Sequence, residues 1–302
     1  MADFNEEVES EDILSDSLQV LYDYTPITYS SAGSIFRYQP PPQLISALPI
    51  PIDPFTITLL TPSTQAGNWS LHASSIWASS IYLADHIQDL HIAQYSKSSG
   101  RSQTRVLELG AGAGLPSILV AKLHENVSVV VSDYPDDEII KALVTNIDEN
   151  NVSSRCRAIP YAWDSDTSVF RDPNADSGSE AGNTFDIVIA ADTLWNSGLH
   201  ALFLRALQKT LRRSADARVY LVAGLHTGRY TLQASMDAVP RHNFQFEEIW
   251  EREVAGSASR PWDVERHEHD DDRERRRWVV WMVLRWTDTV ITTGDGCQHT
   301  VR

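Results

Sequence analysis

The sequence predicts an α/β fold, with a mostly parallel β-sheet, helices on both of its faces and an antiparallel last strand. Three observations support this fold class. Strand and helix patterns alternate between residues 105 and 239. A glycine-rich turn joins the first of these strands to its helix. The last two strand patterns have no helix between them, so we expect them to pair in antiparallel fashion.

Apolar runs bounded by turn residues predict the strands of this sheet. Those of the alternating part span 105–109, 127–132, 157–161, 185–190 and 218–223. Helical spacing of apolar residues predicts a helix before the first strand, over 75 to about 90, and others over 115–124, 136–150, 199–213 and 232–239. Two further strands, over 244–252 and 278–286, complete the sheet.

The composition changes along the chain and predicts four segments. Residues 1–20 read as an acidic, disordered tail, and residues 21–70 as an N-terminal extension with short strands at 35–38 and 55–59. The main domain spans 71–290, and a second tail covers 291–302. Within the domain, residues 164–183 are rich in Ser, Asp and Gly and are predicted to form a loop.

Charge and cysteine content exclude several classes of protein. The 302 residues include 25 Lys and Arg against 41 Asp and Glu, a net charge of −16 that disfavours nucleic acid and anionic membranes as partners. Cys156 and Cys297 are too few for a disulfide framework or a cysteine-built zinc site. The acidic N-terminus lacks a signal-peptide pattern, and no apolar run is long enough to span a bilayer. We therefore expect a soluble, cytoplasmic protein and a monomer.

The glycine-rich turn is the most informative segment of the sequence. It reads Leu-Glu-Leu-Gly-Ala-Gly-Ala-Gly-Leu-Pro over residues 107–116. Glycines let the backbone approach a ligand closely, and the helix that follows presents its N-terminal N–H groups. A dinucleotide fingerprint requires Gly or Ala three residues after Gly112, but Leu115 stands there. The NAD interpretation therefore fails.

An acidic residue follows the second strand. Asp133 comes after Val129-Val130-Val131-Ser132, at about the separation from the glycine turn at which an acid binds ribose hydroxyls in nucleotide-binding folds. The alternative is structural, because Asp133 or Asp136 is equally suited to cap the next helix. The glycine turn favours the ligand-binding interpretation.

The glycine turn together with Ser-Asp-Tyr-Pro-Asp at 132–136 resembles the seven-β-strand S-adenosylmethionine methyltransferases, which have the class I (Rossmann-like) fold. Within them it is similar to the fungal nicotinamide N-methyltransferase-like branch, which includes a protein N-methyltransferase acting on elongation factor 1-alpha. The resemblance covers about residues 71–286. It implies that S-adenosylmethionine is the cofactor. It also implies a set of cofactor-binding residues: Trp77, Glu108, Gly110, Ala111, Gly112, Gly114, Asp133, Trp163 and Ala191.

Two of these aromatics have specific expected roles. The resemblance implies that Trp77 shields the cofactor, although a core aromatic is the alternative. Trp163 follows the third strand, where a ring can stack on adenine. Asp164, next to it, is a weaker candidate because it opens an acidic loop.

The methyl acceptor is expected at the end of the fourth strand, where Asp192 and Trp195 are the candidate catalytic residues. Related lysine methyltransferases carry Asp-x-x-Tyr there, whereas this chain has Trp195 in place of the tyrosine. Asp192 could orient an amine, and Trp195 could contact a methylated ammonium through cation–π attraction. The alternative for Asp192 is a helix cap before Leu199. The run 267–270 (His-Glu-His-Asp) has metal-ligand types but is better explained as a solvated loop, so we expect no metal.

Three functions remain open at this point. The first is an S-adenosylmethionine-dependent N-methyltransferase acting on a lysine or N-terminal amine of a protein, for which the resemblance and the acidic charge suggest a basic translation factor. The second is methylation of a small amine such as nicotinamide. The third is a cofactor-binding interaction protein without catalysis, against which Asp192 and the glycine turn argue.

Overall fold

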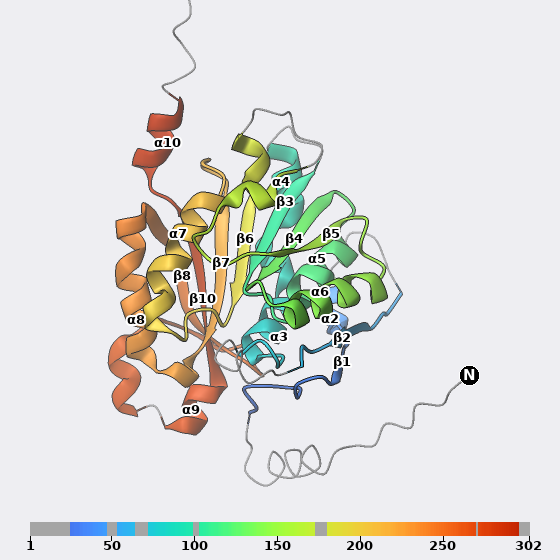
Figure 1. The fold of residues 1–302 in the computed structure, drawn as a ribbon. Helices are drawn as coiled ribbons and strands as arrows, with labels where there is room; N and C mark the ends of the chain where they lie inside the picture. The colour runs from blue at the N-terminus through green and yellow to red at the C-terminus, as the bar shows by residue number, and fades with distance from the viewer. Residues whose placement is uncertain are drawn as a thin grey trace, which may run out of the picture.

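The computed structural model describes residues 25–46, 53–63, 72–98, 103–172, 180–269 and 271–295. The predicted tail over residues 1–20 and most of the one over 291–302 lie outside these ranges. A twisted sheet of eight strands runs through the molecule in the order β5-β4-β3-β6-β7-β10-β8-β9 (Figure 1). Its strands are β3 (Thr104–Leu109), β4 (Val127–Asp133), β5 (Cys156–Pro160), β6 (Ile187–Ala191), β7 (Arg218–Gly224), β8 (Phe244–Glu253), β9 (Ser259–Pro261) and β10 (Trp278–Trp286).

The pairing of these strands confirms the predicted α/β class. β3 pairs in parallel with β4 and β6, and the parallel order continues to β5 and β7. β10 lies between β7 and β8 and is antiparallel to both. The seven predicted strands are all present. β9 was not predicted, because three residues in a polar stretch carry no strand periodicity.

Helices cover both faces of the sheet because its central strands are apolar on both sides. The first face packs against α3 (Ala78–Asp85), α4 (Ile92–Ser98), α5 (Leu115–Leu123) and α6 (Asp137–Glu149). The second packs against α7 (His200–Thr210) and α8 (Arg229–Ala238). In β6, Ile187 and Ile189 enter the first core, and Val188 and Ala190 enter the second. None of the helices in the described ranges is long and apolar enough to cross a membrane.

The predicted helix over residues 75–90 is divided in the structure. Trp77 is extended and pairs with Thr28, because Ala78 N–H donates to Ile27 O (2.9 Å) and Tyr29 N–H donates to Ile76 O (2.9 Å). α3 therefore begins only at Ala78, and a separate 3₁₀ turn, η2 (Ile87–Leu90), follows. This strand-like pairing with a distant segment overrides the local helical pattern and fixes Trp77 at the N-terminus of α3.

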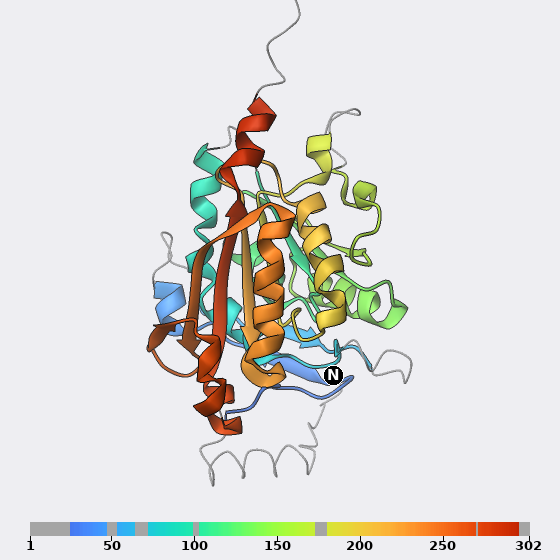
Figure 2. The same cartoon turned by 90° about the vertical axis from the view of Figure 1, so that its left-hand side faces the viewer.

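The N-terminal strands form a hairpin that packs on the helices α5 and α6 rather than on the main sheet. β1 (Ile35–Tyr38) pairs antiparallel with β2 (Ile57–Leu60), and the short helix α2 (Pro42–Ser46) lies between them in sequence. Asn146 of α6 accepts from Leu60 N–H (2.7 Å) and donates to Ala113 O (3.0 Å). The hairpin is thus linked to the glycine turn through a single buried amide. Figure 2 shows the hairpin at the lower end of the sheet.

The connections contain more structure than predicted. The 164–183 loop holds two 3₁₀ turns with a fully buried Phe170. The polar stretch between β8 and β10 contains β9, a 3₁₀ turn and the helix α9 rather than a solvated loop. The remaining short elements are η3 (Thr167–Phe170), η4 (Glu180–Asn183), η5 (Ser197–Leu199), η6 (Leu225–Thr227), η7 (Val239–His242), η8 (Val264–His269), α9 (Asp272–Arg277) and α10 (Asp288–Asp295).

Candidate active site

A cavity of about 370 Å³ opens at the carboxyl ends of the parallel strands. This is the end of the sheet at which α3 begins and β1, β2 and α9 lie (Figure 1). Ligands bind at this edge in open α/β sheets. All of the predicted site residues except Gly114 line it: Trp77, Glu108, Gly110, Ala111, Gly112, Asp133, Trp163, Ala191, Asp192 and Trp195. Gly114 is instead the N-cap of α5 and faces α6, because a Cβ there would lie 3.0 Å from Leu143 Cδ2.

The glycine turn forms one wall of the cavity. Gly112 has φ of +55°, in the left-handed region that side chains disfavour, and its N–H donates to Asp133 Oδ2 (2.7 Å). A Cβ on Gly110 would lie 2.8 Å from Thr193 Cγ2. The turn is therefore held close to the ends of β4 and β6, and Gly110, Ala111 and Gly112 line the cavity.

Asp133 and Asp136 have different roles, and of the two only Asp136 caps a helix. Asp136 is the N-cap of α6 and accepts from the N–H groups of Glu138 and Ile139 (3.1 Å each). Asp133 lies at the cavity, and its carboxylate accepts from Gly112 N–H and from Tyr134 N–H (2.6 Å). Burial raises the pKa of Asp133, and these two backbone hydrogen bonds oppose that shift. Asp133 thus lines the cavity and is held there by the backbone of the glycine turn.

Glu108 is a buried carboxyl at the base of the cavity. It is 1 % exposed, and Ser117 N–H at the start of α5 donates to its Oε2 (3.1 Å). Burial raises the pKa of Glu108 to about 8, against the opposing effect of the Ser117 hydrogen bonds. A cation in the cavity would favour its ionised form.

Trp163 lines the cavity next to the glycine turn. Its Cζ2 is 3.5 Å from the position of a Cβ on Gly110, and its ring contacts Phe203 of α7 (4.9 Å between centroids). Asp164 does not line the cavity. Its carboxylate pairs with Arg205 and Lys209 of α7 (2.7 Å each), so its weaker candidacy has a structural explanation.

Asp192 and Trp195 stand at the other end of the cavity. Asp192 has φ of +53°, and its Oδ1 accepts from Gly224 N–H at the end of β7 (2.9 Å). It is not a helix cap, because Asn196 accepts from Gly198 N–H and caps η5. Trp195 is half-buried and makes an edge contact with His72 (4.8 Å).

Two histidines line the cavity that were not among the predicted site residues, His72 and His226. His72 contacts Trp195 and Trp77, and the ring of His226 stacks on Trp77 (5.0 Å between centroids, 23° between planes). The strand-end rule that selected Asp192 also applies to β7, which ends at Gly224, two residues before His226. His72 lies in the segment before α3 and carries no such signal.

The charge of the cavity follows from these residues. The carboxylates of Asp133 and Asp192 line it together with the rings of Trp77, Trp163 and Trp195, whereas Glu108, with its pKa raised to about 8, contributes a carboxyl that holds its proton at neutral pH. The described residues that line it include no lysine or arginine. This arrangement suits a cationic ligand, because carboxylates and aromatic faces both attract positive charge. No group of three or more potential metal ligands occurs within the described ranges.

Comparison with known proteins identifies the family. The family model described as "Lysine methyltransferase" matches residues 60–228, more than half of the chain. The chain belongs to the lysine methyltransferase family. It is similar to the protein N-terminal and lysine N-methyltransferase efm7 of Schizosaccharomyces pombe, at 30 % identity over 70 % of this chain and 79 % of that one. The relative of the same description from Gibberella zeae is 29 % identical over 71 % of this chain and 79 % of its own.

This lysine methyltransferase is an S-adenosylmethionine-dependent enzyme, as its family and its Rossmann-like sheet require. The cavity fits that donor, because it offers a close-approach glycine turn, a buried carboxylate with free lone pairs at Asp133, and no opposing cation among its described lining residues. The family match ends at residue 228, so it includes both Asp192 and His226.

Proposed function

We propose that this lysine methyltransferase methylates a primary amine of a protein, either a lysine or the N-terminal amine. The observation that carries the proposal is the acidic and aromatic far end of the cavity, where Asp192 and Trp195 lie together with no lysine or arginine among the described lining residues. The printed names of the relatives from Schizosaccharomyces pombe and Gibberella zeae describe the same two kinds of acceptor.

The donor-binding residues occupy the first half of the cavity. Asp133 would accept the ribose hydroxyls, Trp163 would stack on the adenine, and Trp77 would cover the reactive end. Gly110, Ala111 and Gly112 would allow close backbone approach, with Glu108 and Ala191 at the base. S-adenosylmethionine, when bound, supplies a methyl group on a positively charged sulfur.

The remaining residues act on the acceptor. An amine attacks only when it is unprotonated and in line with the methyl group, and lysine ordinarily carries a proton at neutral pH. Asp192 would accept an N–H hydrogen bond and orient the amine. Trp195 would provide the wall for a methylated ammonium through cation–π attraction, in place of the tyrosine of related enzymes.

We also propose which kind of protein supplies the amine. The chain carries a net charge of −16, which favours association with a basic partner. Together with the sequence resemblance, this supports a basic translation factor such as elongation factor 1-alpha, methylated in the cytoplasm by a monomeric enzyme.

The proposal is tested with labelled S-adenosylmethionine and a lysate from cells that lack the enzyme. After incubation with the purified protein, the mixture is separated by electrophoresis, and mass spectrometry locates the methyl group. We expect one labelled protein band with the label on a lysine side chain or an N-terminal amine. Label confined to small molecules would contradict the proposal and favour a small amine as acceptor.

A further inference from the structure

We propose that His226 is a catalytic residue, which takes up the proton that the acceptor amine must lose before methyl transfer. This inference rests on the proposed function, because it requires an amine acceptor at the Asp192 end of the cavity. His226 lines the cavity, and its ring stacks on Trp77, the residue proposed to cover the reactive end of the donor.

Gly224 shows how closely His226 approaches Asp192. An ideal Cβ on Gly224 would lie 2.6 Å from His226 Nδ1 and 3.4 Å from Asp192 Oδ1. The φ of Gly224 is −73°, so its backbone would accept any residue. A glycine within a strand often marks a close approach by another group. Here the imidazole occupies the space that a side chain would need, beside the Asp192 carboxylate.

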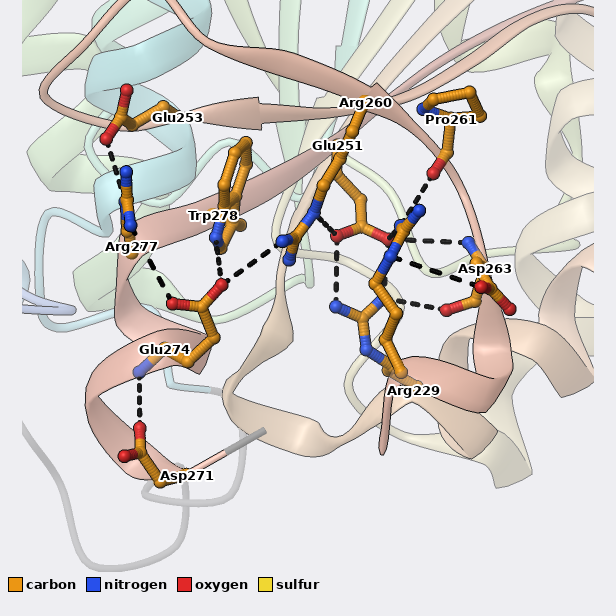
Figure 3. Close-up of polar contacts among 11 residues, drawn as sticks. Arg229, Glu251, Glu253, Arg260, Pro261, Asp263, Asp271, Glu274, Arg277 and Trp278 are labelled. Carbon is orange, nitrogen blue, oxygen red and sulfur yellow. Dashed lines mark hydrogen bonds and ion pairs between the residues drawn. The ribbon is translucent and has the colours of Figure 1, made fainter. Parts of the chain in front are cut away.

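The segment that carries His226 is fixed at both ends. At one end, Gly224 N–H donates to Asp192 Oδ1 (2.9 Å). At the other end, Arg229 begins α8, and its two terminal nitrogens donate to the two carboxylate oxygens of Glu251 (2.6 and 3.0 Å). Both side chains of this ion pair are fully buried. Figure 3 shows that pair at the centre of a wider group of arginines and acids.

Few charged groups face His226. Asp192 approaches from β6 and His72 from the segment before α3. Arg275 and Arg276 of α9 line a small cavity together with His226 and Asp192. Arg276 is paired with Asp272 (2.8 Å), and Arg229 of α8 is paired with Glu251. All of these groups belong to the described part of the chain. Of them, His226 is the one that can accept a proton and lies next to Asp192 in the main cavity.

The protonated amine gives one proton to the neutral imidazole of His226, while Asp192 accepts a hydrogen bond from a remaining N–H. The freed lone pair of the nitrogen forms the bond to the methyl carbon as the methyl–sulfur bond of the donor breaks, and the sulfur keeps that electron pair. The imidazolium and the methylated ammonium then release protons to solvent.

The test compares His226→Phe and His226→Gln with wild type by the pH dependence of kcat/KM, using the labelled protein from the lysate experiment as acceptor. Phenylalanine keeps a ring against Trp77 and glutamine keeps a polar group, but neither can take up a proton. We expect wild type to lose activity on the acid side, in the range in which histidines become protonated, about pH 5 to 8. Above that range wild type should level off, whereas kcat/KM of both variants should keep rising with pH through pH 8, because the amine must then lose its proton to water and its own pKa is about 10.4. At pH 7 both variants should turn over on the order of 10²-fold more slowly. Donor affinity, measured by calorimetry, should be unchanged and shows that the variants are folded.

His72→Phe is the matched control, because His72 is the other histidine of the cavity but lies against Trp195 rather than beside Gly224. We expect this variant to level off between about pH 5 and 8 as wild type does, whatever its rate. Levelling that persists in His226→Phe, that is absent from wild type, or that is lost in His72→Phe would overturn the assignment of His226 but not the proposed function. Failure of wild type to methylate any protein would overturn the proposed function and this assignment with it.

Discussion

Asp133 and Asp136 are separated by only two residues, but the structure gives them different tasks. Asp133 faces the cavity and Asp136 caps α6. We predict that Asp133→Ala weakens S-adenosylmethionine binding by about 1.5–3 kcal/mol, because charge-assisted hydrogen bonds to the donor are lost. Calorimetric titration of the folded variant measures this loss.

Asp136→Ala is the control for that titration. It should lower the free energy of unfolding by about 1 kcal/mol through loss of the cap, with donor affinity unchanged. Donor binding that is normal in Asp133→Ala, or that falls equally in both variants, would show that Asp133 serves only the local fold.

Glu108 should make stability depend on pH in an unusual direction. Its pKa rises from an ordinary 4.5 to about 8 on folding, chiefly through burial. Between these values the folded state holds a proton that the unfolded state has lost, so this group lowers the free energy of unfolding as the pH rises. Glu108→Gln cannot ionise and should lack this contribution. In urea unfolding, the stability of Glu108→Gln relative to wild type should increase from pH 5 to pH 8. If the difference in free energy of unfolding between the two proteins is the same at both pH values, Glu108 does not bind a proton on folding.

Among the elements, the stretch between β8 and β10 is the least predictable part of the fold. The sequence there alternates acids and arginines, which is typical of a solvated loop. In the structure, the fully buried carboxylate of Glu251 on β8 accepts from Arg229, Arg260 and Arg266 (2.6, 2.8 and 2.7 Å), and this group joins β9 and η8 to α8 (Figure 3). Long-range ion pairs of this kind leave no periodic pattern in the sequence.

Removal of Glu251 should be costly, because it leaves Arg229 buried without its carboxylate. We predict that Glu251→Ala lowers the free energy of unfolding by about 3–5 kcal/mol. Asp288→Ala, which removes the exposed ion pair with Arg285, should change it by at most about 1 kcal/mol. Denaturant unfolding of both variants checks the contrast. Equal, small effects would mean that the Glu251 group does not hold these elements together.

The other elements were predictable to different degrees. The strands of the parallel sheet are buried on both faces, so their apolar runs are distinct in the sequence. The helix before the first strand was predicted too long, because the pairing of residues 76–78 with residues 27–29 cannot be read from local periodicity. The glycine turn and Asp133 are encoded within one strand–turn–helix–strand unit, and the sequence could therefore place them.

At the scale of the whole molecule, the acceptor end of the cavity forms only in the folded chain, because its residues come from segments that are far apart in the sequence. It is assembled from the segment before α3, the end of β6 and the turn after β7. The strand-end rule found Asp192 and Trp195 because they follow a recognisable strand. His72 and His226 acquire a role only when Trp77 and Gly224 bring their rings to that end. The division of the cavity into a donor half and an acceptor half is the central claim of this account.

Asp192→Asn tests that division most directly, with donor affinity and single-turnover methyl transfer measured on the same variant. The asparagine oxygen can still accept from Gly224 N–H, a bond of 2.9 Å in the structure, so the turn after β7 should keep its position. We predict a donor affinity within about threefold of wild type and a transfer rate lower on the order of 10²-fold, because the amine loses its orienting charge. Full transfer activity would place the acceptor elsewhere, and loss of donor binding would make Asp192 a donor-binding or folding residue; either result would contradict the account.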